Sequence, residues 1–197
     1  SISDPAYYEY GWSASGGASV QNGVGVLSED SRLASRLTQT FIVPANGDAL
    51  QFTIIGGHMS AATGIPPDAF EVALLNAGTN ASLAGVTGLT NSDAFLNLQS
   101  NGEIYKSGLV TLTDLQGHAL SGIDFSQAVR VTVDLSGIAA GTHAALYFDL
   151  LGFGALDSTV SIDDVRILTP GSTDQPPATS PVTLTAIAED SAGRSIT

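Results

Sequence analysis

The clearest strand pattern in the chain is Val129-Arg130-Val131-Thr132-Val133-Asp134-Leu135. Apolar side chains occupy every second position and polar ones the positions between, which predicts a half-buried antiparallel strand. Shorter runs of the same kind recur along the chain, separated by turns rich in Gly, Asn and Asp. They predict further strands over residues 7–14, 24–28, 70–75, 94–99, 109–113, 144–151 and 160–168.

No stretch of the sequence carries a helical pattern longer than a short turn, which we expect near residues 124–128. A run of residues that ends at Pro44 and a second run over 50–55 flank the turn Asn46-Gly47-Asp48, and this arrangement predicts a β-hairpin. Many short strands at this spacing indicate an all-β fold. We expect a two-sheet antiparallel β-sandwich of the jelly-roll type.

The 197 residues, of which 43% are apolar, provide enough material for one domain with a sizeable core. We expect the sandwich to occupy residues 1–169. Residues 170–181 contain four of the eight prolines and predict a linker. Residues 182–197 contain a strand pattern over 182–188, which either begins a next module or pairs with a sheet edge of this subunit or of a neighbour.

The charge of the chain narrows the classes of partner. Six Lys and Arg residues against 19 Asp and Glu residues give a net charge of −13, which repels nucleic acids and anionic membranes. The absence of cysteine excludes disulfides, Cys-ligated metal sites and a thiol nucleophile. Most carboxylates have no basic residue to pair with, and Asp residues in polar loops are common ligands of Ca²⁺. Cation binding is therefore the first functional expectation.

Two copies of the tripeptide Asp-Ala-Phe stand where loops lead into predicted strands, at residues 68–70 and 93–95. In each copy we expect the Phe to point inward and the Asp to stand at the mouth of the strand. A Ca²⁺ ion takes about six to eight oxygen ligands. If the two strands are neighbours, such an ion is held at their mouths by Asp68, Asp93, Asn91 and loop carbonyls. The alternative is that each Asp forms a turn with its own backbone. In the first interpretation, the ligand site lies at these mouths and is bordered by His58, Ser60, Thr63 and Asn91.

The last predicted strand contains an irregular step at Asp163-Asp164. Val160 and Ile162 share one face, whereas Val165 and Ile167 share a face only after a step of three residues. The inserted residue predicts a β-bulge. Two adjacent carboxylates there indicate either that one of them binds a structural ion or that both are solvated on opposite faces.

Five segments carry a resemblance to known proteins: Tyr10-Gly11-Trp12, Gln39-Thr40-Phe41-Ile42-Val43-Pro44, Leu50-Gln51-Phe52, residues 148–154 and residues 161–166. Across residues 7–168 they resemble the non-catalytic jelly-roll modules of bacterial surface proteins. These modules are similar to carbohydrate-binding modules and to the ligand-binding domains of large calcium-dependent adhesins.

The resemblance implies a set of calcium ligands. In carbohydrate-binding modules, an Ile-Asp-Asp-Val stretch on the last strand helps to hold Ca²⁺ together with an acidic residue near the N-terminus. This implies Asp163 or Asp164, with Glu9, Glu29 or Asp30 as partners. The chain departs from that pattern in having one Trp and five Tyr, so a flat aromatic platform for polysaccharide is not expected. Some adhesin domains instead use Ca²⁺ at the ligand site, which is the arrangement expected at residues 68 and 93.

Signatures of enzymes are missing from the sequence. His58, His118 and His143 lack the spacing of metal ligands, and there is no Gly-x-Ser-x-Gly elbow, phosphate-binding loop or dinucleotide fingerprint. A glycosidase needs only two well-placed carboxylates, for which Glu71 with Asp93 or Asp149 are candidates.

The sequence therefore predicts a Ca²⁺-dependent ligand-binding module, used in adhesion, that binds an external glycan or peptide and has no catalytic activity. We expect it in a secreted or cell-surface protein of a bacterium, and because the chain starts at Ser1 we expect a processed protein or a segment of a longer one. The alternative is a structural subunit or spacer of a surface fibre. A third and weaker alternative is a carbohydrate-active enzyme.

Overall fold

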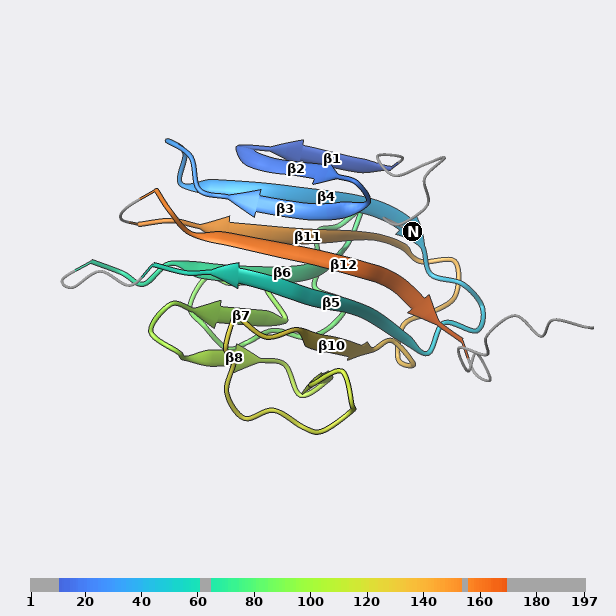
Figure 1. Cartoon of the computed structure of the whole chain (residues 1–197). Coiled ribbons are helices and arrows are strands. Elements are labelled where there is room, and N and C mark those ends of the chain that lie inside the picture. Colours follow the sequence, from blue (N-terminus) through green and yellow to red (C-terminus); the bar gives the residue numbers. More distant parts are fainter. Residues whose placement is uncertain (1–10, 61–64, 154–155, 170–197) are drawn as a thin grey trace, which may run out of the picture.

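The computed structural model describes residues 11–60, 65–153 and 156–169. Within these residues every regular element is a strand, and the twelve strands form two antiparallel six-stranded sheets (Figure 1). No helix capable of spanning a membrane occurs in this part of the chain. The predicted linker over 170–181, the residues 182–197, and the predicted site residues Glu9 and Thr63 lie outside the described residues.

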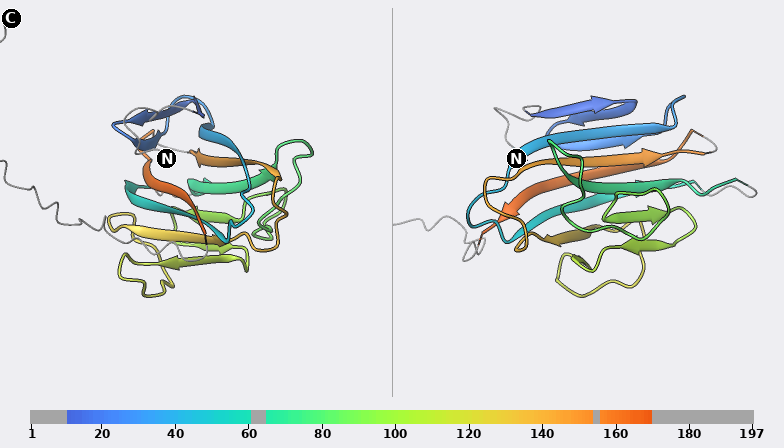
Figure 2. Two further views of the ribbon diagram at one scale, coloured as in Figure 1. Left: turned by 90° about the vertical axis from the view of Figure 1, so that its right-hand side faces the viewer. Right: turned by 180° about the vertical axis from the view of Figure 1, so that it is seen from behind.

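The first sheet, called sheet A, consists in spatial order of β1 (Trp12–Ser15), β4 (Ala34–Ile42), β11 (His143–Leu151), β6 (Ala69–Asn76), β7 (Leu96–Gln99) and β8 (Ile104–Lys106). The second, sheet B, consists of β2 (Gly17–Gln21), β3 (Val24–Ser28), β12 (Thr159–Leu168), β5 (Ala49–His58), β10 (Val129–Asp134) and β9 (Val110–Thr113). In Figure 1, β12 and β5 cross in front of β11 and β6, and the right-hand view of Figure 2 shows the molecule from behind.

The connectivity is that of a jelly roll, as the sequence predicts. The four strands β3-β12-β5-β10 of sheet B face the four strands β4-β11-β6-β7 of sheet A. Successive strands β3, β4, β5 and β6 alternate between the two sheets, and β10, β11 and β12 do the same on the way back. This winding places strands that are far apart in sequence side by side, which is how a jelly roll is built from two Greek keys.

The same winding shows that the predicted hairpin between β4 and β5 is wrong. β4 belongs to sheet A and β5 to sheet B, so the two strands do not pair. The turn itself exists, because Gly47 N–H donates to the Pro44 carbonyl at 3.1 Å. Asp48 N–H then donates to Leu168 on β12 at 2.9 Å, so the chain crosses to the other sheet. A turn signal between two alternating runs cannot distinguish a hairpin from such a crossing.

The core lies between the sheets and is filled by aromatic and aliphatic side chains. Phe148 is at its centre, with ring centroids of Phe52, Trp12 and Phe70 at 5.0, 5.9 and 6.2 Å. Phe70 and Phe95, the aromatic residues of the two Asp-Ala-Phe tripeptides, are both fully buried. Their inward orientation confirms the direction expected for the Phe side chain at the start of each strand.

The predicted bulge in the last strand is confirmed. The register of β12 against β5 shifts between Asp163 and Arg166. Asp164 has a backbone φ of 55°, in the left-handed region that L-residues seldom adopt. Asp163 Oδ1 accepts a hydrogen bond from the Asp164 N–H at 2.7 Å, which supports this turn of the backbone.

Candidate ligand-binding face

The two Asp-Ala-Phe tripeptides lead into neighbouring strands, but the structure keeps their carboxylates apart. Asp68 precedes β6 and Asp93 precedes the segment leading into β7, and these two strands pair antiparallel. Antiparallel neighbours begin at opposite ends, so Asp68 and Asp93 do not meet. Phe95 N–H donates to the Val72 carbonyl, which lies roughly 13 Å along the strand direction from Asp68.

Asp68 instead joins three parts of the backbone at one corner of the sandwich. Its side chain is buried, with the residue only 3% exposed. Oδ1 accepts from the Phe153 N–H at 2.7 Å, and Oδ2 accepts from the Ser158 hydroxyl at 2.6 Å. The Ser158 hydroxyl oxygen also accepts from the Ser60 N–H at 2.8 Å. Asp68 therefore links the start of β6 to the end of β5 and to the connection between β11 and β12.

Glu29 lies at the same corner and shares Ser158 with Asp68. Its Oε2 accepts from the N–H groups of Asp157 and Ser158 at 3.0 and 2.8 Å. Its Oε1 is buried and has no hydrogen-bond partner among the described residues. The carboxylate lies so close to Gly152 that a Cβ at that position would collide with Oε1. The hydrogen bonds that hold the two carboxylates all come from neutral donors.

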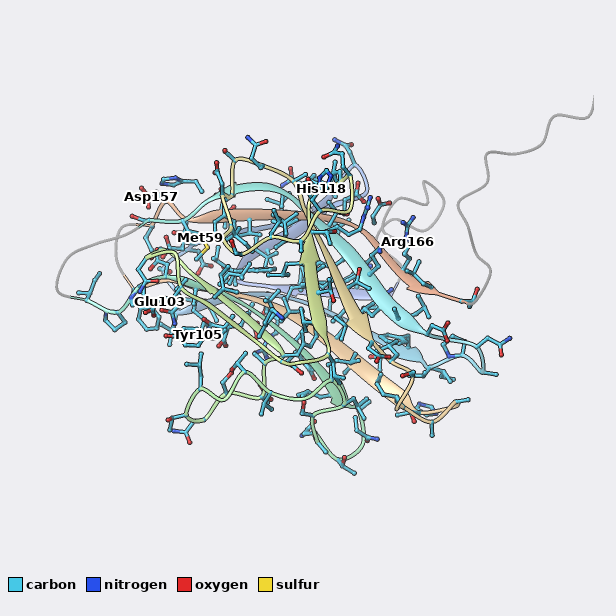
Figure 3. The ribbon with its side chains drawn as sticks, turned by 90° about the horizontal axis from the view of Figure 1, so that it is seen from below. Met59, Glu103, Tyr105, His118, Asp157 and Arg166 are labelled. Carbon is cyan, nitrogen blue, oxygen red and sulfur yellow. The ribbon has the colours of Figure 1, made fainter. Side chains whose placement is uncertain are left out.

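Two further residues of the predicted ligand site do not join this carboxylate pair. His58 is exposed, and its Nε2 lies 4.0 Å from Asp157 Oδ2. Asn91 is exposed in a loop with a φ of 59°, so its conformation fits the turn-forming alternative. Figure 3 shows Asp157 at the end of the molecule away from Arg166.

The acidic residues that the resemblance implies as calcium ligands are dispersed. Asp163 lies roughly 16 Å along β12 from the corner where Glu29 contacts Ser158. Asp30 Oδ1 accepts from the Arg32 N–H at 2.7 Å, a local turn. Across residues 11–60, 65–153 and 156–169, no group of three or more His, Asp or Glu side chains is arranged to hold a metal ion.

Six polar residues form one row across the outer face of sheet A, and we call them the polar row. Each lies directly opposite the next on the neighbouring strand, and such residues share one face of a sheet. From β1 to β8 the row is Ser15, Arg36, Asp149, Glu71, Asn97 and Tyr105. Residues adjacent to the row in sequence, such as Leu37, Phe70 and Phe148, are fully buried in the core.

An ion pair forms the first half of the polar row. Arg36 Nε and Nη2 donate to Asp149 Oδ1 and Oδ2 at 2.6 and 2.8 Å, a bidentate arrangement. The hydrogen bond that Arg36 donates to Asp149 raises the pKa of Arg36 above its ordinary value despite the opposing effect of burial, and the charges of Asp149, Tyr147 and Asp93 add to the rise. The guanidinium carbon lies 5.1 Å from the centre of the Tyr147 ring. Tyr147 and Asp93 therefore belong to the surroundings of the row.

A carboxylate and an amide form the second half. Asn97 Nδ2 donates to Glu71 Oε1 at 2.7 Å, and the Ser92 hydroxyl lies 3.4 Å from the same oxygen. Asn97 is only 3% exposed, yet its Oδ1 is buried without a hydrogen-bond partner among the described residues. No Lys, Arg or His side chain in the described part of the chain forms an ion pair with Glu71. At the end of the row, the Tyr105 hydroxyl donates to Glu103 Oε2 at 2.7 Å, and Figure 3 labels both residues.

Sequence analysis identified only some of the residues on this face. Glu71, Asp149 and Asp93 stand out as carboxylates that a glycosidase could use, and the structure places Glu71 and Asp149 directly opposite each other. Arg36, Asn97 and Tyr105 carried no signal, because each stands on a strand where polar outward residues are ordinary. Only the strand order brings the six positions to one level.

Comparison with models of known protein families finds no match, and no curated protein matches the chain.

Proposed function

We propose that this chain is a non-catalytic module that binds an external glycan on the outer face of sheet A. The observation that carries the proposal is the polar row, which crosses all six strands without interruption. We assign the module to a secreted or cell-surface protein, because such a ligand is met outside the cell.

The chemistry of the row suits a ligand rich in hydroxyl groups. A sugar hydroxyl both donates and accepts, and the row offers acceptors on Glu71 and donors on Arg36. A ligand hydroxyl can displace the long contact between Ser92 and Glu71 at 3.4 Å. The rings of Tyr105 and Tyr147 are half-buried beside these groups and offer apolar faces for a sugar ring.

A second property of the face favours a glycan over a peptide. Extended peptides commonly bind to sheets by adding a strand at an edge, where backbone groups are free. The central strands β11 and β6 already pair on both sides. Recognition at the polar row therefore depends on side chains alone. Polar side chains recognise hydroxyl groups through hydrogen bonds.

The same face supports binding better than hydrolysis. Glu71 and Asp149 lie directly opposite each other, which is compatible with the carboxylate spacing of about 5 Å in retaining glycosidases. However, both oxygens of Asp149 accept hydrogen bonds from Arg36, so this carboxylate is not free to act as a nucleophile or a general acid. A carbohydrate-active enzyme is thus the weaker proposal. Release of reducing sugar from any bound glycan would favour it.

Calcium belongs to the proposal as a stabilising ion at the corner of Glu29 and Asp68. Among the described residues, the buried Oε1 of Glu29 has no partner and no cation pairs with Asp68. Oxygen atoms of this kind are the ligands that Ca²⁺ prefers. Glu29 and Asp68 would hold the ion, which would balance their charges. Melting in millimolar Ca²⁺ and in EDTA tests this part, and equal melting temperatures would overturn it.

The binding proposal is tested with a glycan array and a peptide library, each probed with and without EDTA. We expect glycan binding in the wild type and at least a tenfold loss in Glu71→Gln, because the amide removes one acceptor charge but still accepts from Asn97. Asp114→Asn, a partly exposed carboxylate outside sheet A, is the matched control and should bind as the wild type does. Binding of peptides only, or equal glycan binding by Glu71→Gln, would refute the proposal. Binding to neither set would favour the spacer.

A further inference from the structure

Negative charge is in excess along the polar row. Arg36 and Asp149 neutralise each other, and within the described part of the chain no other ion pair involves a residue of the row. Glu71 therefore keeps its charge. Asp93 adds a second charge beside it, because the hydroxyl of the preceding residue, Ser92, lies 3.4 Å from Glu71 Oε1. Asp93 is exposed, so its carboxylate is open to a ligand.

The basic residue on the neighbouring strand β8 does not balance this charge. Lys106 lies opposite Leu96, which is fully buried, so it stands on the side of the sheet that faces the core rather than the row. Its Nζ donates to the Val110 carbonyl at 2.8 Å. Glu103, which accepts from Tyr105 at the end of the row, likewise has no ion pair among the described residues. The excess of negative charge thus continues to the end of the row.

The hydrogen bonds of Asn97 show independently which kind of group is missing. Asn97 is only 3% exposed, and its Nδ2 is already used in the 2.7 Å bond to Glu71 Oε1. The Oδ1 of the same amide is buried and has no partner among the described residues. The unfilled hydrogen-bonding positions around Glu71 are therefore acceptors, and what they lack is a donor.

We propose that the glycan bound on this face is an amino sugar with a free amino group, whose ammonium is held by Glu71, Asp93 and Asn97. This inference rests on the proposed function and names the class of sugar. An ammonium carries three donors, no acceptor and a positive charge, so it supplies what this part of the row lacks. A neutral sugar hydroxyl supplies one donor and no charge. The carboxylate of an acidic sugar is repelled.

The test compares two forms of one glycan by isothermal titration calorimetry. The probes are glucosamine and galactosamine oligomers and their N-acetylated forms of equal length, which keep the rings and hydroxyls but lose the charge. We expect the free amine to bind about tenfold more tightly than the acetylated form, because hydrogen bonds to charged groups are the strong ones. Equal affinity, or binding only of glycans without an amine, would overturn this inference and leave the proposed function standing. Binding of no glycan at all would refute both.

Variants separate a specific site from general attraction, because a chain with a net charge of −13 attracts any polycation. Asp93→Asn should reduce the preference for the free amine by about threefold and leave binding of the acetylated form unchanged. Asp134→Asn is the matched control, since it removes the same charge from an exposed residue on β10 of sheet B. It should keep the full preference. An unchanged preference in Asp93→Asn, an equal loss in Asp134→Asn, or equally tight binding of oligolysine would each contradict the proposed site.

Discussion

Replacement of Asp68 by Ala gives the most direct test of how the corner works. The sequence alone predicts that this change abolishes ligand binding and leaves the sandwich folded, because Phe70 still fills the core. The structure predicts a different result. Asp68 is buried and accepts hydrogen bonds from the Phe153 N–H and the buried Ser158 hydroxyl, so its loss leaves both donors without this acceptor.

The size of the effect follows from these two bonds. A hydrogen bond to a charged group contributes about 1.5–3 kcal/mol, and a buried unsatisfied donor carries a penalty of about 1–3 kcal/mol. We therefore expect Asp68→Ala to lower the free energy of unfolding by about 3–5 kcal/mol. For a domain of this size, such a loss corresponds to a fall in melting temperature of roughly 10 °C.

The assay is urea unfolding of the wild type, Asp68→Ala and Asp93→Ala, followed by the fluorescence of Trp12. Asp93 is the matched control, because it heads the same tripeptide but is not buried. Its replacement should change the unfolding free energy by no more than about 0.5 kcal/mol. Equal stability of the two variants would show that the hydrogen bonds of Asp68 contribute nothing, and the reasoning about the corner would fail.

Three further predictions concern single features of the structure. The hydrogen bond from His118 to Asp114 lowers the pKa of the Asp114 carboxyl. The ionised carboxylate therefore stabilises the fold above its ordinary pKa of 3.8, and this stabilisation is lost as the pH falls through the lowered pKa. In an NMR titration, His118→Ala should move the Asp114 midpoint back up. At the bulge, where Asp164 has a φ of 55°, Asp164→Gly should preserve or raise the melting temperature, and Asp164→Val should cost about 1–2 kcal/mol in urea unfolding. Phe148→Ala should cost about 3–5 kcal/mol in the same assay, because its ring is fully buried among other aromatic residues.

The strand pattern could be predicted from the sequence because each strand of a sandwich buries one face. β3 lies over the predicted residues 24–28, and β10 to β12 match their predicted ranges to within one residue at each end. β2 and β8 were not predicted, because a run rich in Gly and Ser and a run of three residues carry little alternation. The bulge in β12 was predictable for the same reason as the strands, since it breaks the period of two.

The arrangement of strands was less accessible to sequence analysis. Pairing decides whether the starts of two strands meet, and the sequence does not show that β6 and β7 begin at opposite ends of the sheet. The corner illustrates the same limit: Glu29, Asp68 and Ser158 are distant in sequence, and only the winding of the jelly roll brings them together. Asp68 could be recognised from its position at the start of a strand, but its buried partners could not.

Folding and recognition make different demands on the outer face of sheet A. The jelly roll requires apolar residues at inward positions, and it leaves the identity of outward residues largely free. Six polar side chains at one level are therefore not needed to form the sheet. Asn97 is the informative member, because its Nδ2 donates to Glu71 at 2.7 Å while its Oδ1 is buried and unpaired within the described part of the chain, and an unpaired buried group carries a penalty of about 1–3 kcal/mol. An unpaired acceptor next to the carboxylate of Glu71 fits the proposed role of this face, because a hydroxyl group of a ligand can donate to both oxygen atoms.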